Sequence, residues 1–120
     1  MIAWRASSYD AIPDFGLLYD SVPLYAGRAD VGFYVQEAAS VRGPVLELGC
    51  GTGRMLLPLA RAGHTVVGLD NSRQMLARCR AKVAAEPAAV RARITLHDQD
   101  VRAFNLGGGA TYPLVIAPFR

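Results

Sequence analysis

The feature that most constrains this chain is the glycine-rich turn 49–53 (Gly-Cys-Gly-Thr-Gly), which directly follows the apolar segment 44–48. A second apolar segment, 65–69, is followed by Asp70, about 20 residues beyond the start of the turn. A buried strand, a glycine turn and an acid after the next strand are typical of nucleotide-cofactor sites in parallel sheets. The pattern therefore predicts an α/β protein, with a purely structural turn as the competing interpretation.

Short apolar segments alternate with helix-like segments from Pro44 onward, as in parallel βαβ units. Asp30, Thr52 and Ser72 are the predicted N-caps, and Pro58 is expected to bend its helix slightly. Right-handed crossovers are expected to place the helices after Gly53 and Ser72 over the sheet. The helices are expected at 15–21, at 30–40, from Thr52 to Gly63 and from Ser72 to Pro87, and the strands at 44–48, 65–69, 94–97 and 114–117.

The residues after the turn restrict the kind of nucleotide. The dinucleotide fingerprint requires a third glycine where this chain has Arg54, which disfavours a nicotinamide-dependent oxidoreductase. A Walker loop requires Lys followed by Ser or Thr, and the chain has Arg54-Met55. The remaining pattern is Glu-x-Gly-x-Gly-x-Gly, from Glu47 to Gly53.

Residues 45–54 (Val-Leu-Glu-Leu-Gly-Cys-Gly-Thr-Gly-Arg) resemble motif I of the class I S-adenosylmethionine-dependent methyltransferases. Pro113 stands where that family often has an acid after an aromatic residue, so the role of that acid has no counterpart here. The resemblance implies a Rossmann-like, three-layer αβα fold with a mostly parallel sheet, strand order 3-2-1-4 and an N-terminal helical lid. Later segments similar to the family's motifs are 68–72 with Met75-Leu76, 97–102 and 112–119.

The resemblance implies S-adenosyl-L-methionine as cofactor, and the residue types suit its chemical groups. Bare backbone in the turn accommodates the methionine end, Asp70 accepts from both ribose hydroxyls, and Glu47 complements the ammonium group. Asp100 and the Val101 amide would hold adenine, which a neighbouring side chain would cover. The implied cofactor-binding residues are Tyr19, Glu47, Gly49, Cys50, Gly51, Gly53, Asp70, Asn71, Met75, Asp100 and Val101.

Four of these assignments have a structural alternative. Asp70 could instead contact only the start of the following helix, and Asp98 could replace Asp100 after a slip in strand register. Met75 fits the buried stripe of its helix as well as the adenine face. Tyr19 either closes over the cofactor, as N-terminal tyrosines do in small-molecule members of the family, or packs as an ordinary aromatic residue.

Methyl transfer from a sulfonium depends mainly on positioning and desolvation, so no catalytic residue is assigned. Members that methylate amino groups of DNA or protein usually carry Asn/Asp-Pro-Pro-Tyr/Phe after the fourth strand, where this chain has Ala-Pro-Phe at 117–119. The resemblance therefore implies in-line transfer to nitrogen or oxygen of a small molecule. A catalytically incomplete S-adenosylmethionine-binding or interaction module is the alternative.

Composition excludes other classes of function. Thirteen basic and ten acidic residues give a net charge of +3, but the basic residues are scattered, so no nucleic-acid partner is expected. No apolar run is long enough for a membrane span and no secretory signal is visible, so a cytoplasmic location is expected. Cys50 and Cys79 stand far apart in the sequence and form no C-x-x-C, and His64 and His97 are single, so no metal site is expected.

The chain divides into a predicted N-terminal lid, residues 1–43, and a predicted cofactor-binding half of a methyltransferase domain, residues 44–120. The family's sheet has further strands beyond the fourth. Strand 114–117 is apolar and uncharged, so its outer edge is expected to pair with a second copy or with the missing C-terminal strands.

Overall fold

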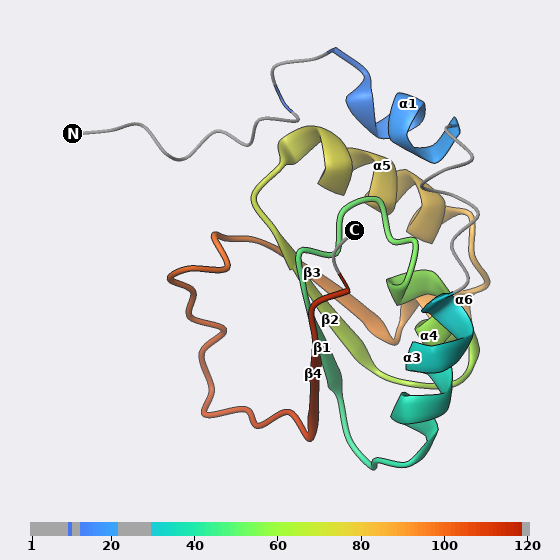
Figure 1. Ribbon diagram of the computed structural model, residues 1–120, viewed down its shortest axis with the longest axis vertical. Helices are drawn as coiled ribbons and strands as arrows, with labels where there is room; N and C mark the ends of the chain where they lie inside the picture. Colours follow the sequence, from blue (N-terminus) through green and yellow to red (C-terminus); the bar gives the residue numbers. More distant parts are fainter. Residues whose placement is uncertain (1–9, 11–12, 22–29, 119–120) are drawn as a thin grey trace.

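The computed structural model describes residues 10, 13–21 and 30–118. Its centre is a four-stranded parallel sheet in the order β3-β2-β1-β4 (Figure 1). The predicted order and direction of the strands are confirmed, and so is the Rossmann-like α/β class. The strands are β1 (Val45–Leu48), β2 (Val66–Asp70), β3 (Ile94–Asp98) and β4 (Leu114–Ile116).

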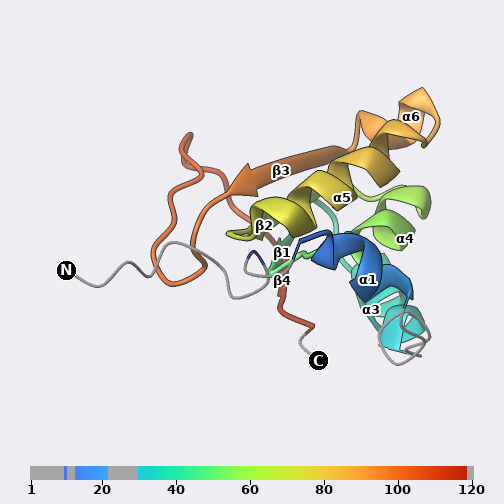
Figure 2. The same cartoon turned by 90° about the horizontal axis from the view of Figure 1, so that it is seen from above.

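Two helices form the connections between successive parallel strands. Helix α4 (Leu56–Arg61) connects β1 to β2, and α5 (Arg73–Ala84) connects β2 to β3. Both crossovers are right-handed and run in the same direction along the sheet, so both helices cover one face (Figure 2). Val45, Val66 and Ile116 belong to the core on this face and are at most 5% exposed.

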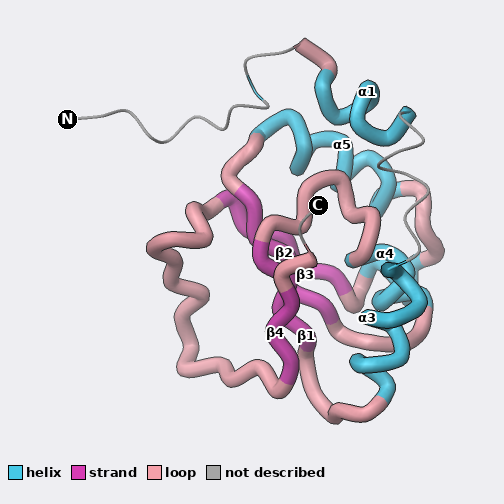
Figure 3. Tube along the Cα trace, in the orientation of Figure 1, coloured by secondary structure: helices cyan, strands magenta, loops and turns pink. Residues whose placement is uncertain are grey.

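The opposite face of the sheet is crossed by residues 99–113, the connection between β3 and β4, which forms no helix (Figure 3). Three consecutive glycines, 107–109, adopt left-handed φ angles of 72°, 67° and 63° in this connection. Leu46 and Val67 on this face are buried, whereas Val115 of β4 is 50% exposed. The described helices thus form one layer, and an irregular loop lies on the other side.

The N-terminal helices pack on the helical layer rather than on the sheet (Figure 2). Helix α1 (Phe15–Ser21) lies along α5, and α3 (Asp30–Ala39) lies against α4. The bounds of α1 are those predicted, and α3 ends one residue before the predicted Ser40. This placement brings residues of α1 to the carboxyl ends of the strands.

The start of α4 differs from the prediction. Its N-cap position is Met55, with no side-chain cap bond, so Thr52 does not cap it. Instead, the Thr52 hydroxyl donates to Asp20 Oδ1 at 2.7 Å. Because the helix begins later, Pro58 falls in its first turn, where backbone amides have no intrahelical partner, so the expected bend loses its cause.

The start of α5 agrees with the prediction, since Ser72 Oγ accepts from the Met75 amide at 3.2 Å. A short helix, α6 (Ala88–Arg91), precedes β3 and is not indicated by the apolar pattern. Four residues are too few to show a helical period. Among the described residues, no helix is long and apolar enough to cross a membrane.

Candidate cofactor site

A cavity of about 110 Å³ opens at the carboxyl ends of β1 and β2, the edge where open α/β sheets bind their ligands. We call it the β1–β2 cavity. Seven of the eleven predicted site residues line it, and four further residues complete its wall. The lining residues are Tyr19, Glu47, Gly49, Cys50, Gly51, Thr52, Arg54, Met55, Asp70, Met75 and Pro118.

The glycine turn is attached to the end of β2 through its backbone. The amides of Gly49 and Cys50 both donate to Leu69 O, at 2.7 and 3.0 Å. Gly51 has a φ of 57°, and a Cβ there would lie 3.4 Å from Met75 Cε. Gly51 therefore presents bare backbone to the cavity.

Gly53 has a different role from the other turn glycines. It does not line the β1–β2 cavity, and a Cβ at this position would lie 2.9 Å from Cys79 Sγ. The glycine therefore allows α5 to approach the turn closely.

Cys50 and Cys79, far apart in the sequence, are neighbours in the core. Both are buried free thiols. A hydrogen bond to Cys79, together with burial, raises the pKa of Cys50 well above its ordinary value. Cys50 therefore stays a protonated thiol at neutral pH.

Asp70 fixes the turn from the end of β2. Its Oδ2 accepts from the Gly51 amide at 2.8 Å, and its Oδ1 accepts from the Ser72 amide at 2.9 Å. Burial raises the pKa of the Asp70 carboxyl, and the backbone hydrogen bonds act in the opposite direction. The bond to Ser72 is the contact expected if Asp70 serves only the start of α5. Each carboxylate oxygen has a second lone pair, so a ligand hydroxyl can also be accepted.

Glu47 lies on β1 at the base of the same cavity and is 2% exposed. Its Oε1 has no hydrogen-bond partner among the described residues. Burial is the main cause that raises the pKa of Glu47 well above its ordinary value. The side chain is therefore a buried carboxyl that lines the cavity with an unsatisfied oxygen, and its burial favours the protonated form.

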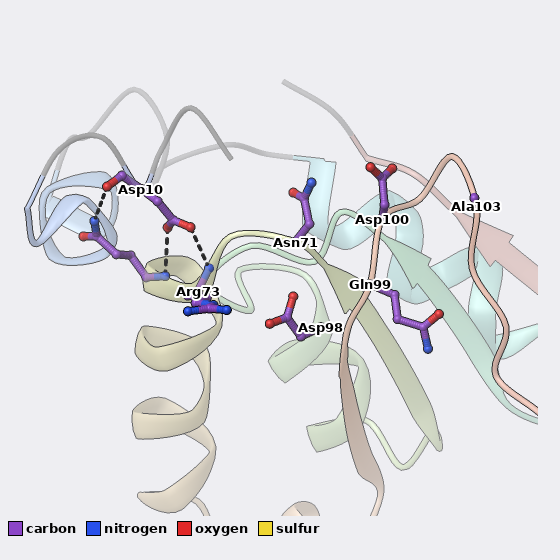
Figure 4. A pocket seen from close by; sticks show the side chains of 8 residues that line it. Asp10, Asn71, Arg73, Asp98, Gln99, Asp100 and Ala103 are labelled. Carbon is purple, nitrogen blue, oxygen red and sulfur yellow. Dashed lines mark hydrogen bonds between the residues drawn. The ribbon is translucent and has the colours of Figure 1, made fainter. Parts of the chain in front are cut away.

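A second, wider cavity of about 940 Å³ lies beyond Asp70, and we call it the β2–β3 cavity. In Figure 4, Asn71 and Asp100 extend to the same side of it from neighbouring segments. Its lining residues are Asp10, Asn71, Arg73, Gln74, Asp98, Gln99, Asp100 and Ala103. Two further predicted site residues thus come to the same sheet edge.

The register places both candidate adenine acids at the β2–β3 cavity. Asp98 pairs with Asp70 at the ends of their strands, and Asp100 follows β3. Asp100 bonds to the side chain and backbone of Arg102, which lowers its pKa to about 2. Val101 is 39% exposed and does not line the cavity.

Asp10 is a residue at this edge that the sequence does not indicate. Its Oδ1 accepts from Ser72 Oγ at 2.8 Å and from the Gln74 amide at 3.1 Å, and its Oδ2 accepts from the Arg73 amide at 3.1 Å (Figure 4). Burial opposes the shift, but these bonds lower the pKa of Asp10. The partners are 62 to 64 residues away, beyond the reach of any local pattern.

Asp20 and Asp30 attach the N-terminal helices to the same region. Asp20 accepts from Thr52 Oγ1 at 2.7 Å and from Arg78 Nε at 2.8 Å. Despite partial burial, these bonds lower the pKa of Asp20. Asp30 accepts from Arg54 Nη1 at 2.7 Å. Three N-terminal carboxylates, Asp10, Asp20 and Asp30, thus hold this segment beside the glycine turn and α5.

The described side chains do not indicate a metal site. Within the described ranges, no group of three or more His, Cys, Asp or Glu side chains is placed to hold a metal ion. Phe119, in the last of the motif-like segments, lies outside the described residues.

Comparison with protein families gives one match that covers most of the chain. A family model described as "Methyltransferase domain" matches residues 45–119, which include the glycine turn and Asp70. A curated relative, the carboxy-S-adenosyl-L-methionine synthase of Methylococcus capsulatus, is 38% identical over 78 residues, covering 61% of this chain and 32% of the relative.

Solved structures agree with this match. The CcbJ methyltransferase from Streptomyces caelestis has a TM-score of 0.79 and 30% identity, covering 96% of this chain and 45% of that one. The glycopeptide N-methyltransferase MtfA complexed with (S)-adenosyl-L-methionine has a TM-score of 0.61 and 38% identity, covering 65% and 34%. The chain thus spans about a third of the curated relative and less than half of these solved chains.

Proposed function

The chain belongs to the methyltransferase domain family, and from this premise we propose that it binds S-adenosyl-L-methionine across the two cavities and takes part in methyl transfer to a small molecule. The observation that carries the proposal is the sheet edge itself. There, the bare turn and the unpartnered Glu47 lie on one side of Asp70, and the wider β2–β3 cavity lies on the other. This order matches the order of groups along the cofactor.

Each chemical group of the cofactor would have a matching place in or between the two cavities. The narrow β1–β2 cavity suits the amino-acid end, because the turn exposes backbone and Glu47 offers an oxygen with no other partner. Asp70, between the cavities, suits the ribose diol. The wider cavity suits adenine, with Asn71 and either Asp98 or Asp100 at its wall.

The proposed chemistry asks little of the protein beyond positioning. The bound cofactor would supply an activated methyl group on its sulfonium. The chain's own residues would fix both ends of the ligand and exclude water, with Tyr19 and Pro118 closing the wall of the β1–β2 cavity. We assign no general base.

The acceptor belongs to the proposal as well. A small molecule with a reactive nitrogen or oxygen is supported by the similarity to a glycopeptide N-methyltransferase. It is also supported by the Ala117-Pro118 sequence after β4, which lacks the polar residue that amino-methylating enzymes of DNA or protein usually carry.

The domain roles follow from the same premise. We propose that residues 1–43 act as a lid, supported by Tyr19 on α1, which reaches the β1–β2 cavity. Further strands, from the same protein or from a second copy, would complete the sheet at β4. In the described residues, β4 pairs only with β1.

Binding is tested by titrating the full chain with S-adenosylhomocysteine, the demethylated product, in a calorimeter. Asp70→Ala should weaken the affinity by about 1.5 to 3 kcal/mol, as expected for a charge-assisted hydrogen bond. Asp70→Asn, which keeps one acceptor oxygen, should lose less. Equal affinity in parent and Asp70→Ala would remove Asp70 from the site.

Two matched variants decide the adenine contact. Asp98→Asn and Asp100→Asn remove one charge each at neighbouring places on the wall of the wider cavity. We expect Asp100→Asn to weaken binding more. The opposite ranking would assign the contact to Asp98.

Methyl transfer itself is tested with radiolabelled cofactor and a panel of small amines and alcohols. Product formation would establish the activity of this chain. Binding without transfer to any acceptor would favour the alternative, a cofactor-binding module that lacks catalysis on its own.

A further inference from the structure

The two cysteines of the chain lie together at the β1–β2 cavity. Cys50 belongs to the glycine turn and Cys79 to α5, and their thiols are hydrogen-bonded to each other. Other contacts agree with this placement, since a Cβ added at Gly53 would lie 2.9 Å from Cys79 Sγ and the Gly53 amide donates to Cys50 O at 3.0 Å. Two sulfur atoms from different elements therefore meet at one point.

Two glycines leave the space that both sulfur atoms occupy. A Cβ at Gly53 would lie 2.9 Å from Cys79 Sγ, and a Cβ at Gly68 of β2 would lie 2.9 Å from Cys50 Sγ. A side chain at either glycine would displace one of the thiols. The contact between the thiols thus depends on how closely the turn, β2 and α5 pack.

The two thiols differ in their access to the cavity. Cys50 lines it, although the residue is only 4% exposed, whereas Cys79 is fully buried and does not line it. Buried thiols are usually unreactive because oxidants cannot reach them. Here a small neutral oxidant has a route to Cys50 through the cavity, and Cys50 in turn contacts Cys79.

We propose that Cys50 and Cys79 are a modification site, which a peroxide entering the β1–β2 cavity converts to an intramolecular disulfide and which a ligand bound in that cavity protects. The disulfide would covalently join the turn to α5, two elements that contribute to the cavity wall. The oxidation is independent of the proposed function, and only the identity of the protecting ligand rests on it.

The reaction has two steps and consumes one molecule of hydrogen peroxide. The Cys50 sulfur attacks a peroxide oxygen, the O–O bond breaks, and the departing hydroxide takes the thiol proton as water, which leaves a sulfenic acid on Cys50. Cys79 then attacks the Cys50 sulfur, the S–O bond breaks, and the departing hydroxide takes the Cys79 proton as a second water. Two electrons thus pass from the sulfur atoms to the peroxide.

The hydrogen bond between the thiols suits Cys79 to the second step. This bond is the main cause that lowers the pKa of Cys79, although burial acts in the opposite direction. A thiol with more thiolate character is the better nucleophile toward an oxidised sulfur.

The experiment treats the folded 120-residue chain with hydrogen peroxide and then counts free thiols after denaturation. Because the chain has two cysteines, an intramolecular disulfide removes both thiols and leaves a single chain on a non-reducing gel. Peptide mass spectrometry should identify the link between Cys50 and Cys79, and dithiothreitol should restore both thiols.

Ligand protection tests the route through the cavity. At a concentration of S-adenosylhomocysteine about ten times its Kd, oxidation should slow about tenfold, because only unoccupied chains react. An unchanged rate in chains that bind the ligand would overturn the inference.

Two matched variants separate the roles of the sulfur atoms. Cys79→Ser leaves the thiol at the cavity, so peroxide should form a sulfenic acid on Cys50 that dimedone labels. Cys50→Ser leaves only the fully buried thiol, which should be labelled more slowly. The reverse ranking would contradict entry through the cavity.

The remaining outcomes separate this inference from the proposed function. Retention of both thiols in the parent, under conditions that oxidise glutathione in a parallel sample, would overturn the inference, and so would disulfides formed only between two chains. If S-adenosylhomocysteine does not bind the parent, the proposed function fails, and the formation of the intramolecular disulfide still decides the inference.

Discussion

Glu47 is a buried acid and Asp70 a partly buried one at the same end of the sheet, but the fold satisfies them differently. Asp70 receives two backbone amides, from Gly51 and Ser72, and serves the empty structure by holding the turn. Glu47 Oε1 receives none. A carboxyl that costs stability while empty is a residue retained for binding rather than for folding.

That cost is measurable as a pH dependence of stability. The pKa of Glu47 in the folded protein is raised above its ordinary value of 4.5. Below pH 4.5 the carboxyl is protonated in both the folded and the unfolded chain, so it costs no stability. As the pH rises from 4.5 toward the folded pKa, only the unfolded chain loses the proton, and the folded protein becomes less stable. The loss is about 1.4 kcal/mol per pH unit within this window. We expect Glu47→Gln and parent to unfold at the same urea concentration near pH 4 and the variant to be more stable by about 1–3 kcal/mol near pH 7. A difference that does not change with pH would contradict this, and Glu37→Gln, the same change at an exposed carboxylate of α3, should match the parent throughout.

Alanine substitutions at three glycines should distinguish the stability cost of backbone strain from that of steric conflict. At Gly63, φ is 105° and no atom lies within 4 Å of a Cβ, so alanine should cost about 1–2 kcal/mol from conformation alone. At Gly68, a Cβ would lie 2.6 Å from Leu56 Cδ1, and overpacking should cost about 1–3 kcal/mol. Gly53→Ala combines both effects, through its φ of 90° and the contact with Cys79, and should cost about 2–5 kcal/mol. Urea unfolding checks the ranking, and equal losses at Gly53 and Gly63 would contradict the close approach of α5.

At the scale of elements, the apolar pattern was sufficient to predict the four strands, and the resemblance to the family predicted their order. All four strands lie within one residue of their predicted bounds, because buried parallel strands require continuous apolar runs. The start of α4 could not be predicted from the position of Thr52. Its hydroxyl satisfies Asp20, 32 residues away, and a tertiary partner of this kind overrides the local capping preference.

The attachment of α1 through Asp20 gives an element-scale prediction. Asp20→Ala removes the acceptor for Thr52, Arg78 and Lys82, so α1 should detach more often while the sheet stays closed. We expect hydrogen exchange of residues 13–21 to accelerate roughly 10- to 100-fold, with residues 66–70 unchanged. Asp20→Asn keeps the acceptor for Thr52 and should give an intermediate rate. Equal acceleration in both regions would indicate global destabilisation instead.

At the scale of the whole molecule, one apolar core joins the sheet, α4 and α3, to which α3 contributes Ala38. The N-terminal segment has polar contacts in addition. Its carboxylates Asp10, Asp20 and Asp30 accept hydrogen bonds from partners 24 to 64 residues away. Nothing in the local sequence identifies such partners, and this is why the glycine turn was predicted and its supporting carboxylates were not.

The outer edge of β4 leads to a prediction about association. Its residues are apolar, and Val115 is half exposed, so the edge favours pairing with another strand. Sedimentation of the 120-residue chain should show concentration-dependent self-association, and Val115→Lys should suppress it. Thr95→Lys, on the same face of the opposite edge strand, is the control and should leave association unchanged. A monomer at every concentration would contradict the prediction.

The run of three glycines at 107–109 makes the molecule practical to engineer. A Cβ added at any of these residues would have no atom within 4 Å, and the three glycines are exposed and line neither cavity. Because lengthening a flexible loop costs little entropy, this tip is a suitable place to insert a fluorophore-bearing peptide or an affinity tag. A reporter placed there would follow ligand binding from the opposite face of the sheet without altering any residue that lines either cavity.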